Sequence, residues 1–214
     1  MKKVVIFGAT GGLGNLISKR LADYDVINLG SSDVDITDHT QVNEFFKNNS
    51  VDIVINFAGV NFDKFAHKLT PNDKDIINNQ IDVNIKGTVN VVSSCLNNMR
   101  QQQFGRIILV SSVLADHPVM STSIYAGCKG FVDSFTKTVA LENAGKNINC
   151  NSLQLGYFDG GLTYKIPEAF RDTIKNNIPS KRWGTIDELY NTIDYLIETG
   201  YITGQNINIS GGII

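Results

Sequence analysis

Tyr125 and Lys129 are the residues whose types and spacing point most directly to chemistry. Four positions apart in a helical segment, their side chains share one face and lie within interacting range. A nearby ammonium favours the phenolate and lowers a tyrosine pKa from about 10, which makes the phenol a usable general acid or base. Ser112 ends a preceding β-branched run, where a hydroxyl could orient a carbonyl oxygen. A Tyr-x-x-x-Lys pair alone is more often a solvated helix face, so the prediction depends on what accompanies it.

A glycine-rich turn accompanies the pair, with the sequence Gly8-Ala9-Thr10-Gly11-Gly12-Leu13-Gly14. Small residues here let the chain turn tightly, let a phosphate approach the backbone and seat a helix against a sheet. Free N–H groups and the positive end of the helix dipole would hold a pyrophosphate. A glycine pattern alone could be only a flexible turn. Its place between the first strand and the first helix favours dinucleotide binding.

Six short β-branched runs must position these groups: Val4–Phe7, Val26–Leu29, Asp52–Asn56, Arg106–Ser111, Ile148–Leu153 and Asn206–Ile209. The runs are nearly continuous rather than alternating in polarity, which is typical of strands buried on both faces. Helical segments alternate with them. The sequence therefore predicts an α/β fold, a doubly wound parallel sheet of the Rossmann type with helices on both faces.

The expected helices follow from periodicity and capping signals. An apolar face from Leu13 to Leu21 follows the first strand, and Thr70-Pro71 opens another helix with a capping residue and a proline at its first position. Further helices are expected at Asp82–Gln101, Ile124–Ala144 and Asp187–Thr199. No repeat or linker interrupts the chain, so residues 1–214 are expected to form a single domain.

Composition excludes several classes of protein. The chain of 214 residues is 42% hydrophobic and carries 19 Lys+Arg against 21 Asp+Glu, which excludes disorder and gives no electrostatic footprint for nucleic acid or anionic lipid. The first apolar run is too short for a signal peptide, and no later run approaches a membrane span. A cytoplasmic location is therefore expected. Cys95, Cys128 and Cys150 lack metal-ligand spacing, so we expect buried thiols and no metal site.

Several motifs in order resemble the short-chain dehydrogenase/reductase family over nearly the whole chain. Gly8-x-x-x-Gly12-x-Gly14 looks like the cofactor turn of that family, and Asn56-Phe57-Ala58-Gly59 looks like its Asn-Asn-Ala-Gly strand end. Asp35-Ile36-Thr37-Asp38 is similar to the acidic segment beside the adenine, and Asn84 matches a fourth catalytic position after Ser112, Tyr125 and Lys129. The tail Tyr201–Gln205 and Gly211-Gly212 continue the resemblance.

The resemblance implies an oxidoreductase that transfers hydride between a nicotinamide coenzyme and a carbonyl or alcohol carbon. Tyr125 would exchange the proton with the substrate oxygen, Ser112 would hydrogen-bond that oxygen, and Lys129 would hold the nicotinamide ribose and lower the pKa of Tyr125. Asn84 would support a water that replenishes protons. The expected cofactor contacts are Gly8, Thr10, Gly11, Gly12, Leu13, Gly14, Ser31, Ser32, Asp35, Ile36, Asn56, Ala58, Gly59, Tyr125, Lys129, Gly156 and Phe158.

The chain departs from the family pattern in two regions. Phe57 replaces the second Asn of the strand-end motif, and Phe7 stands where a Thr usually precedes the glycine turn, so two polar supports are lost. After the fifth strand the family has a Pro-Gly pair and a Thr beside the nicotinamide, whereas this chain has Leu155-Gly156 and then Gly160. A short substrate lid is expected at about residues 158–179.

NADP is preferred over NAD as the expected coenzyme. An acid at the end of the second strand binds the ribose hydroxyls of NAD and repels a 2′-phosphate. Here that strand leads to Gly30, Ser31 and Ser32, which carry no charge and offer two hydroxyl donors. NAD stays possible if Asp33 reaches the ribose in a different register.

The alternatives differ in function class. A non-catalytic NAD(P)-binding sensor or scaffold would be signalled by a lost Tyr or Lys, and an epimerase or dehydratase needs a larger C-terminal region. An enoyl reductase is disfavoured because that branch spaces its Tyr and Lys more widely. The substrate stays open between a carrier-bound 3-oxoacyl thioester, a keto-sugar nucleotide and a small ketone. The long helices Asp82–Gln101 and Ile124–Ala144 predict a homodimer or homotetramer.

Overall fold

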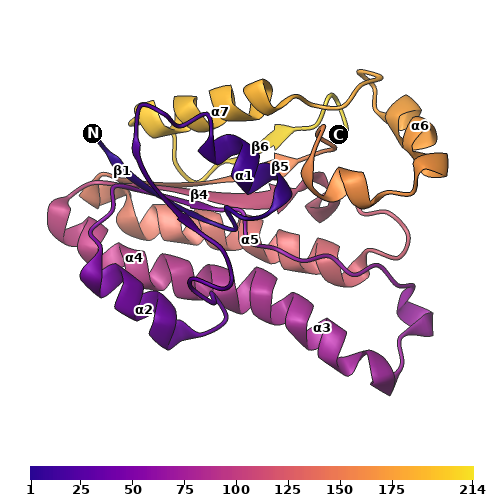
Figure 1. The fold of residues 1–214 in the computed structure, drawn as a ribbon, viewed down its shortest axis with the longest axis horizontal. Coiled ribbons are helices and arrows are strands. Elements are labelled where there is room, and N and C mark those ends of the chain that lie inside the picture. Colours follow the sequence, from indigo (N-terminus) through magenta and orange to yellow (C-terminus); the bar gives the residue numbers. More distant parts are fainter.

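The computed structural model describes residues 1–214 and joins the six predicted strands in one parallel sheet of order β2-β1-β3-β4-β5-β6 (Figure 1). The strands are β1 Lys3–Phe7, β2 Asp25–Leu29, β3 Ile53–Asn56, β4 Gly105–Ser112, β5 Ile148–Leu155 and β6 Asn206–Ile209. Every neighbouring pair is parallel. The predicted doubly wound α/β fold is confirmed, and the strand order reverses between β1 and β3, where such sheets open a binding crevice at their carboxyl ends.

Helices cover both faces of the sheet (Figure 1). On one side lie α1 Gly12–Ser18 and α7 Ile186–Glu198, and on the other lie α2 His39–Asn48, α4 Thr88–Gln102 and α5 Ser123–Asn143. Successive residues of β1 enter opposite cores, because side chains alternate across a strand. Val4 and Ile6 pack with the α1 and α7 side, whereas Val5 and Phe7 pack with the α2, α4 and α5 side. Apolar burial on both faces thus holds β1 rigidly beneath the glycine turn.

The helix expected to begin at Asp82 begins earlier. A capping box at Thr70 opens η2 Pro71–Asp73, and the chain continues through α3 Lys74–Ile81 and a π-helical turn, η3 Asp82–Gly87, into α4. Ile81 itself has helical torsion angles, with φ −69° and ψ −45°, so no boundary exists before Asp82. The predicted start was therefore wrong.

Two helices were not predicted. In α2 the Asp38 carboxylate caps the N-terminus by accepting hydrogen bonds from the backbone N–H groups of Thr40 and Gln41. In the expected lid, α6 Glu168–Asn177 stands apart from the sheet and buries none of its residues (Figure 1). The remaining short turns are η1 Ala66–Lys68, η4 Val113–Ala115, η5 Ala144–Lys146 and η6 Gly161–Lys165.

Two further observations concern the chain as a whole. Cys95, Cys128 and Cys150 are buried free thiols, as predicted. None of the helices combines the length and the apolar character that a membrane crossing requires.

Candidate active site

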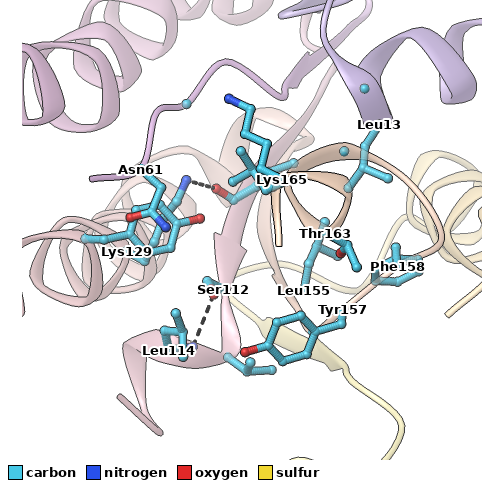
Figure 2. A pocket seen from close by; sticks show the side chains of 18 of the residues that line it. Leu13, Asn61, Ser112, Leu114, Lys129, Leu155, Tyr157, Phe158, Thr163 and Lys165 are labelled. Carbon is cyan, nitrogen blue, oxygen red and sulfur yellow. Dashed lines mark hydrogen bonds between the residues drawn. The ribbon is translucent and has the colours of Figure 1, made fainter. Parts of the chain in front are cut away.

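A cleft of about 570 Å³ opens at the carboxyl ends of the strands (Figure 2). The glycine turn after β1, the loop after β3, the end of β4, the start of α5 and the segment after β5 all line it. Of the predicted site residues it brings together Gly8, Gly11, Gly12, Leu13, Gly14, Gly59, Ser112, Tyr125, Lys129, Gly156 and Phe158. One cavity therefore holds both the glycine turn and the Ser, Tyr and Lys side chains.

Ser112, Tyr125 and Lys129 enter the cleft from two neighbouring elements. Ser112 is the last residue of β4, and its Oγ accepts a hydrogen bond of 3.2 Å from the backbone N–H of Leu114. Tyr125 lies in the first turn of α5, with Lys129 one turn later and its Nζ 5.5 Å from the Tyr125 ring centroid. Lys129 Nζ donates a 2.8 Å hydrogen bond to the carbonyl of Val110 (Figure 2). This bond ties the ammonium to the β4 backbone beside Ser112.

The pKa values of this pair differ from the sequence-based expectation. Burial raises the pKa of Tyr125 to about 12, although the neighbouring Ser112 hydroxyl lowers it in part. The expected lowering of the tyrosine pKa was therefore wrong for the protein alone, because removing the phenolate from water outweighs its favourable neighbours. Burial also lowers the pKa of Lys129 to about 8. Near neutrality the site thus presents a protonated phenol beside a mostly protonated amine.

Asn84 lies behind the cleft, within the π-helical turn η3. Its Nδ2 donates to the carbonyls of Val60 and Gln80, both at 2.8 Å, while its Oδ1 is buried without a partner. A Cβ added at Gly59 would lie 3.0 Å from that Oδ1 and 3.5 Å from Lys129 Nζ. The unpartnered oxygen of Asn84 and the ammonium thus flank the same glycine.

The glycine turn admits no larger side chain at three of its positions. A Cβ at Gly8 would lie 2.6 Å from the backbone nitrogen of Ala58, and Gly8 has a φ of +78°. A Cβ at Gly14 would lie 2.3 Å from the Gly8 carbonyl oxygen, and one at Gly12 would lie 2.4 Å from the Cα of Gly161. Glycine is required here by close backbone approach, and η6 packs directly on the turn.

The residues predicted for the adenosine end lie outside the cleft. The Thr10 side chain packs against Gly30, where a Cβ would meet it at 2.6 Å. Ser31 and Ser32 follow on an exposed loop. The Asp33 carboxylate accepts a 2.8 Å hydrogen bond from the Gly30 N–H, so it is already engaged by its own turn.

The acidic segment and the strand-end motif carry internal contacts. Asp35 Oδ1 accepts hydrogen bonds from the backbone N–H and the hydroxyl of Thr37, at 2.9 and 2.8 Å. The Ile36 side chain is buried against Gly87. The buried Asn56 Oδ1 accepts a 3.1 Å bond from Ala58 N. None of these groups lines the cleft. Asn56 instead holds the start of the loop after β3, and other residues of that loop line the cleft.

Other cleft residues were not found by sequence reasoning. Asn61 and Asp63 follow β3, Tyr157 follows β5, and Thr163 and Lys165 come from η6 (Figure 2). Their positions after strand ends were the available signal, since carboxyl ends of parallel strands meet at one edge. Apolar side chains also line the cleft, among them Leu114, Val119, Met120, Leu162, Ile166 and Ile174. The cleft therefore combines an apolar lining with the polar side chains of Ser112, Tyr125 and Lys129.

Comparison with known proteins gives consistent matches. A family model described as enoyl-(acyl carrier protein) reductase matches residues 12–214. The chain is 34% identical over 188 residues to the 3-oxoacyl-[acyl-carrier-protein] reductase of Thermotoga maritima, covering 85% of this chain and 75% of that protein. It is 28% identical over 236 aligned positions to carbonyl reductase family member 4 of Xenopus tropicalis, covering 99% and 98%. A solved structure entitled "ElxO with NADP Bound" has a similar fold, with a TM-score of 0.89, 24% identity and coverage of 100% and 99%.

Proposed function

Since the chain belongs to the short-chain dehydrogenase/reductase family, we propose that it is an NAD(P)H-dependent carbonyl reductase in which Tyr125 is the general acid. The observation that carries this proposal is the single cleft in which the glycine turn meets Ser112, Tyr125 and Lys129. Proximity within one cavity is what hydride and proton transfer to the same substrate require.

The residues of the cleft fit a nicotinamide dinucleotide. Gly11 and Gly12 are exposed at the N-terminus of α1, where their backbone can meet a pyrophosphate, and the unpartnered Asn84 Oδ1 offers a buried acceptor near Lys129. Bound there, the coenzyme supplies or accepts a hydride at its nicotinamide. Lys129 would hold the ribose hydroxyls, and Gly156, Phe158 and Thr163 would border the nicotinamide end.

The proton chemistry falls to this chain's own side chains. With a pKa of about 12, the Tyr125 phenol is protonated at neutral pH and can donate a proton to the oxygen of a carbonyl as it is reduced. Ser112 Oγ, at the end of β4, would hydrogen-bond the same oxygen and fix its orientation. Asn84 would hold a water through which Tyr125 regains its proton.

The coenzyme proposed is NADP, with NAD as the alternative. The loop after β2 presents the exposed Ser31 and Ser32 hydroxyls, while the Asp33 carboxylate is bound by the Gly30 N–H. Two hydroxyl donors accept a 2′-phosphate more readily than a carboxylate would. The similar solved structure holds NADP, which agrees with this choice.

A 3-oxoacyl thioester is the substrate class that we favour among the three compatible ones. Two of the similar proteins are named as a 3-oxoacyl-[acyl-carrier-protein] reductase and an acetoacetyl-CoA reductase. The apolar part of the cleft lining suits an acyl chain better than a keto-sugar nucleotide. Residues 158–179, with η6 and α6, would form the lid over that substrate.

The experiment is a spectrophotometric screen of NADPH and NADH oxidation. The substrates are a 3-oxoacyl thioester, a keto-sugar nucleotide, a small ketone and, because of the description of the matching family, an enoyl thioester. We expect turnover with the 3-oxoacyl thioester and none with the enoyl thioester, since Tyr125 and Lys129 are only four residues apart. Coenzyme binding with no turnover on any substrate would favour a sensor or scaffold.

A homodimer or homotetramer is also proposed. Phe131 and Phe135 on α5 are half-buried and stacked, with ring centroids 5.4 Å apart, and Leu141 on the same helix is 83% exposed. Apolar side chains on a long outer helix favour burial against a second copy.

A further inference from the structure

A buried carboxylate, Asp133, lies on α5 beneath the candidate active site. Its side chain is 5% exposed and is surrounded by neutral donors. Asp133 Oδ1 accepts a 2.7 Å hydrogen bond from the hydroxyl of Ser152, and Oδ2 accepts a 2.8 Å bond from the amide of Gln154. The same amide donates to Asp116 at 2.7 Å. Asp133 forms no ion pair.

Lys129 is the complementary buried charge. It lies one helical turn before Asp133 and is 4% exposed. Its side chain donates only to the Val110 carbonyl and has no carboxylate within ion-pair distance. A buried charge without a counter-charge is costly, and residues four apart on a helix face lie close enough to interact. Each of the two charges therefore lacks a direct partner but has the other nearby.

The other groups around Lys129 do not supply a negative charge near neutrality. On α5 they are Tyr125, whose pKa is about 12, and Cys128, whose pKa burial also raises. The elements packed against it from η3, the β3 loop and β4 present the neutral Asn84, Gly59 and Val110. Asp63 faces Tyr125 from across the cleft.

Asp133 is thus the carboxylate that acts on Lys129. Burial lowers the pKa of Lys129 most strongly, and Cys128 and Asp133 raise it in the opposite direction. The exposed Lys137, one turn beyond Asp133, is the other cation on this side of α5.

We propose that Asp133 is a positioning residue that keeps Lys129 in its ammonium form, with Ser152 and Gln154 fixing the carboxylate in place by hydrogen bonds. An ammonium is needed because a neutral amine binds the coenzyme ribose less well and no longer favours charge on the Tyr125 oxygen. The expected effect on coenzyme binding rests on the proposed function, in which Lys129 holds the ribose. The effect of Asp133 on the protonation of Lys129 does not depend on that function.

The direct test is a ¹³C NMR titration of the coenzyme-free protein labelled at lysine Cε. The Lys129 signal is assigned by its loss in Lys129→Met. The parent should titrate near pH 8, and Asp133→Asn, which keeps the shape but turns one acceptor oxygen into a donor, should move the midpoint down by about one pH unit. Asp116→Asn is the matched control, because it neutralises the other carboxylate on Gln154, and it should leave the midpoint unchanged. An unchanged midpoint in Asp133→Asn overturns the proposal.

A second variant covers the case in which Asp133→Asn does not fold. Asp133→Ile combined with Ser152→Val and Gln154→Ala removes the carboxylate together with its two donors, so that neither donor is left unpartnered in the core. Of the groups that lose a hydrogen bond, Asp116 is exposed and Asn206 is only part-buried. It should show the same downward shift of the Lys129 midpoint. A midpoint equal to that of the parent would again overturn the proposal.

The consequence for coenzyme binding is measured separately by NADPH fluorescence as a function of pH. At pH 8 Asp133→Asn should bind NADPH about five-fold more weakly than the parent, because the ammonium fraction falls by that factor when the midpoint drops one unit. Asp133→Glu should restore binding. If the parent binds no NADPH at any pH, the proposed function is wrong, and the NMR titration still decides the role of Asp133.

Discussion

Replacing Gly12 by Ala tests whether the glycine turn and the η6 segment form one coenzyme site. The new Cβ would lie 2.4 Å from the Cα of Gly161 and 2.7 Å from its nitrogen. Because carbon atoms in contact stay about 3.5 Å apart, the two backbones must separate by about 1 Å. Neither side can relieve the clash by rotating a side chain. Overpacking of this kind costs about 1–3 kcal/mol, and each kcal/mol lowers Tm by about 2–4 °C at this chain length.

The functional effect should exceed the loss of stability. A displacement of about 1 Å at a positioning group can cost about 10²-fold, so kcat/KM for NADPH should fall by about that factor while the variant stays folded at 25 °C. Calorimetry gives Tm, and NADPH fluorescence with initial rates gives Kd and kcat/KM. Gly11→Ala is the comparison, because its Cβ meets only the Gly8 oxygen at 3.2 Å, and its loss should be smaller. Unaltered NADPH binding in a folded Gly12→Ala protein would refute the reasoning.

Four other predictions follow from the site and from α5. Tyr125→Phe should lower turnover by about 10²-fold or more while NADPH binding survives, since only the proton donor is removed; near-normal turnover on a substrate accepted by the parent would contradict the role of Tyr125. Titration of each reduced coenzyme into the apo protein should show tighter binding of NADPH, whereas tighter NADH binding would place Asp33 or another acid at the ribose. Gly130→Ala should raise the free energy of unfolding by about 0.5–1 kcal/mol in denaturant titrations, because nothing lies within 4 Å of the added Cβ in the middle of α5. Light scattering at micromolar concentration should give a multiple of 23.5 kDa, and the mass of one chain would reject the oligomer.

The strands could be predicted from the sequence because burial on both faces leaves a local signature. Ile53–Asn56, for example, is fully buried, and its residues are apolar up to the final Asn. Helix α6 has no buried residue, and its apolar spacing, with Phe170 and Ile174 four positions apart, extends over little more than one turn, so the sequence signal is short. Helix α2 had a signal in the Asp38 cap, but the resemblance assigned Asp38 to an acidic segment beside the adenine. From the sequence, Asp38 could be either a helix cap or part of a segment beside the adenine. Its hydrogen bonds from the backbone of Thr40 and Gln41 identify it as the cap of α2.

The helix boundary at Asp82 was beyond sequence reasoning for a different reason. A π-helical turn inserts extra backbone into a continuous helix without requiring a cap, a glycine or a proline. What marks η3 is the Asn84 side chain, whose amide bonds to the Val60 and Gln80 carbonyls. The Val60 carbonyl belongs to the loop after β3. That contact joins segments far apart in sequence, so no local pattern predicts it.

In the candidate site, residue spacing determines which side chains share a helix face, whereas burial determines their pKa values. A separation of four residues was enough to predict that Tyr125 and Lys129 share a helix face, because helical geometry is local. It could not give the direction of the tyrosine pKa shift, which depends on how much of the phenol the rest of the chain covers. In the folded protein burial raises the pKa of Tyr125 to about 12 and lowers that of Lys129 to about 8. As pH rises the ammonium is therefore lost before the phenol, and both protons are largely in place near pH 7. A site in that state can supply a proton to a substrate oxygen, as the carbonyl reduction proposed above requires.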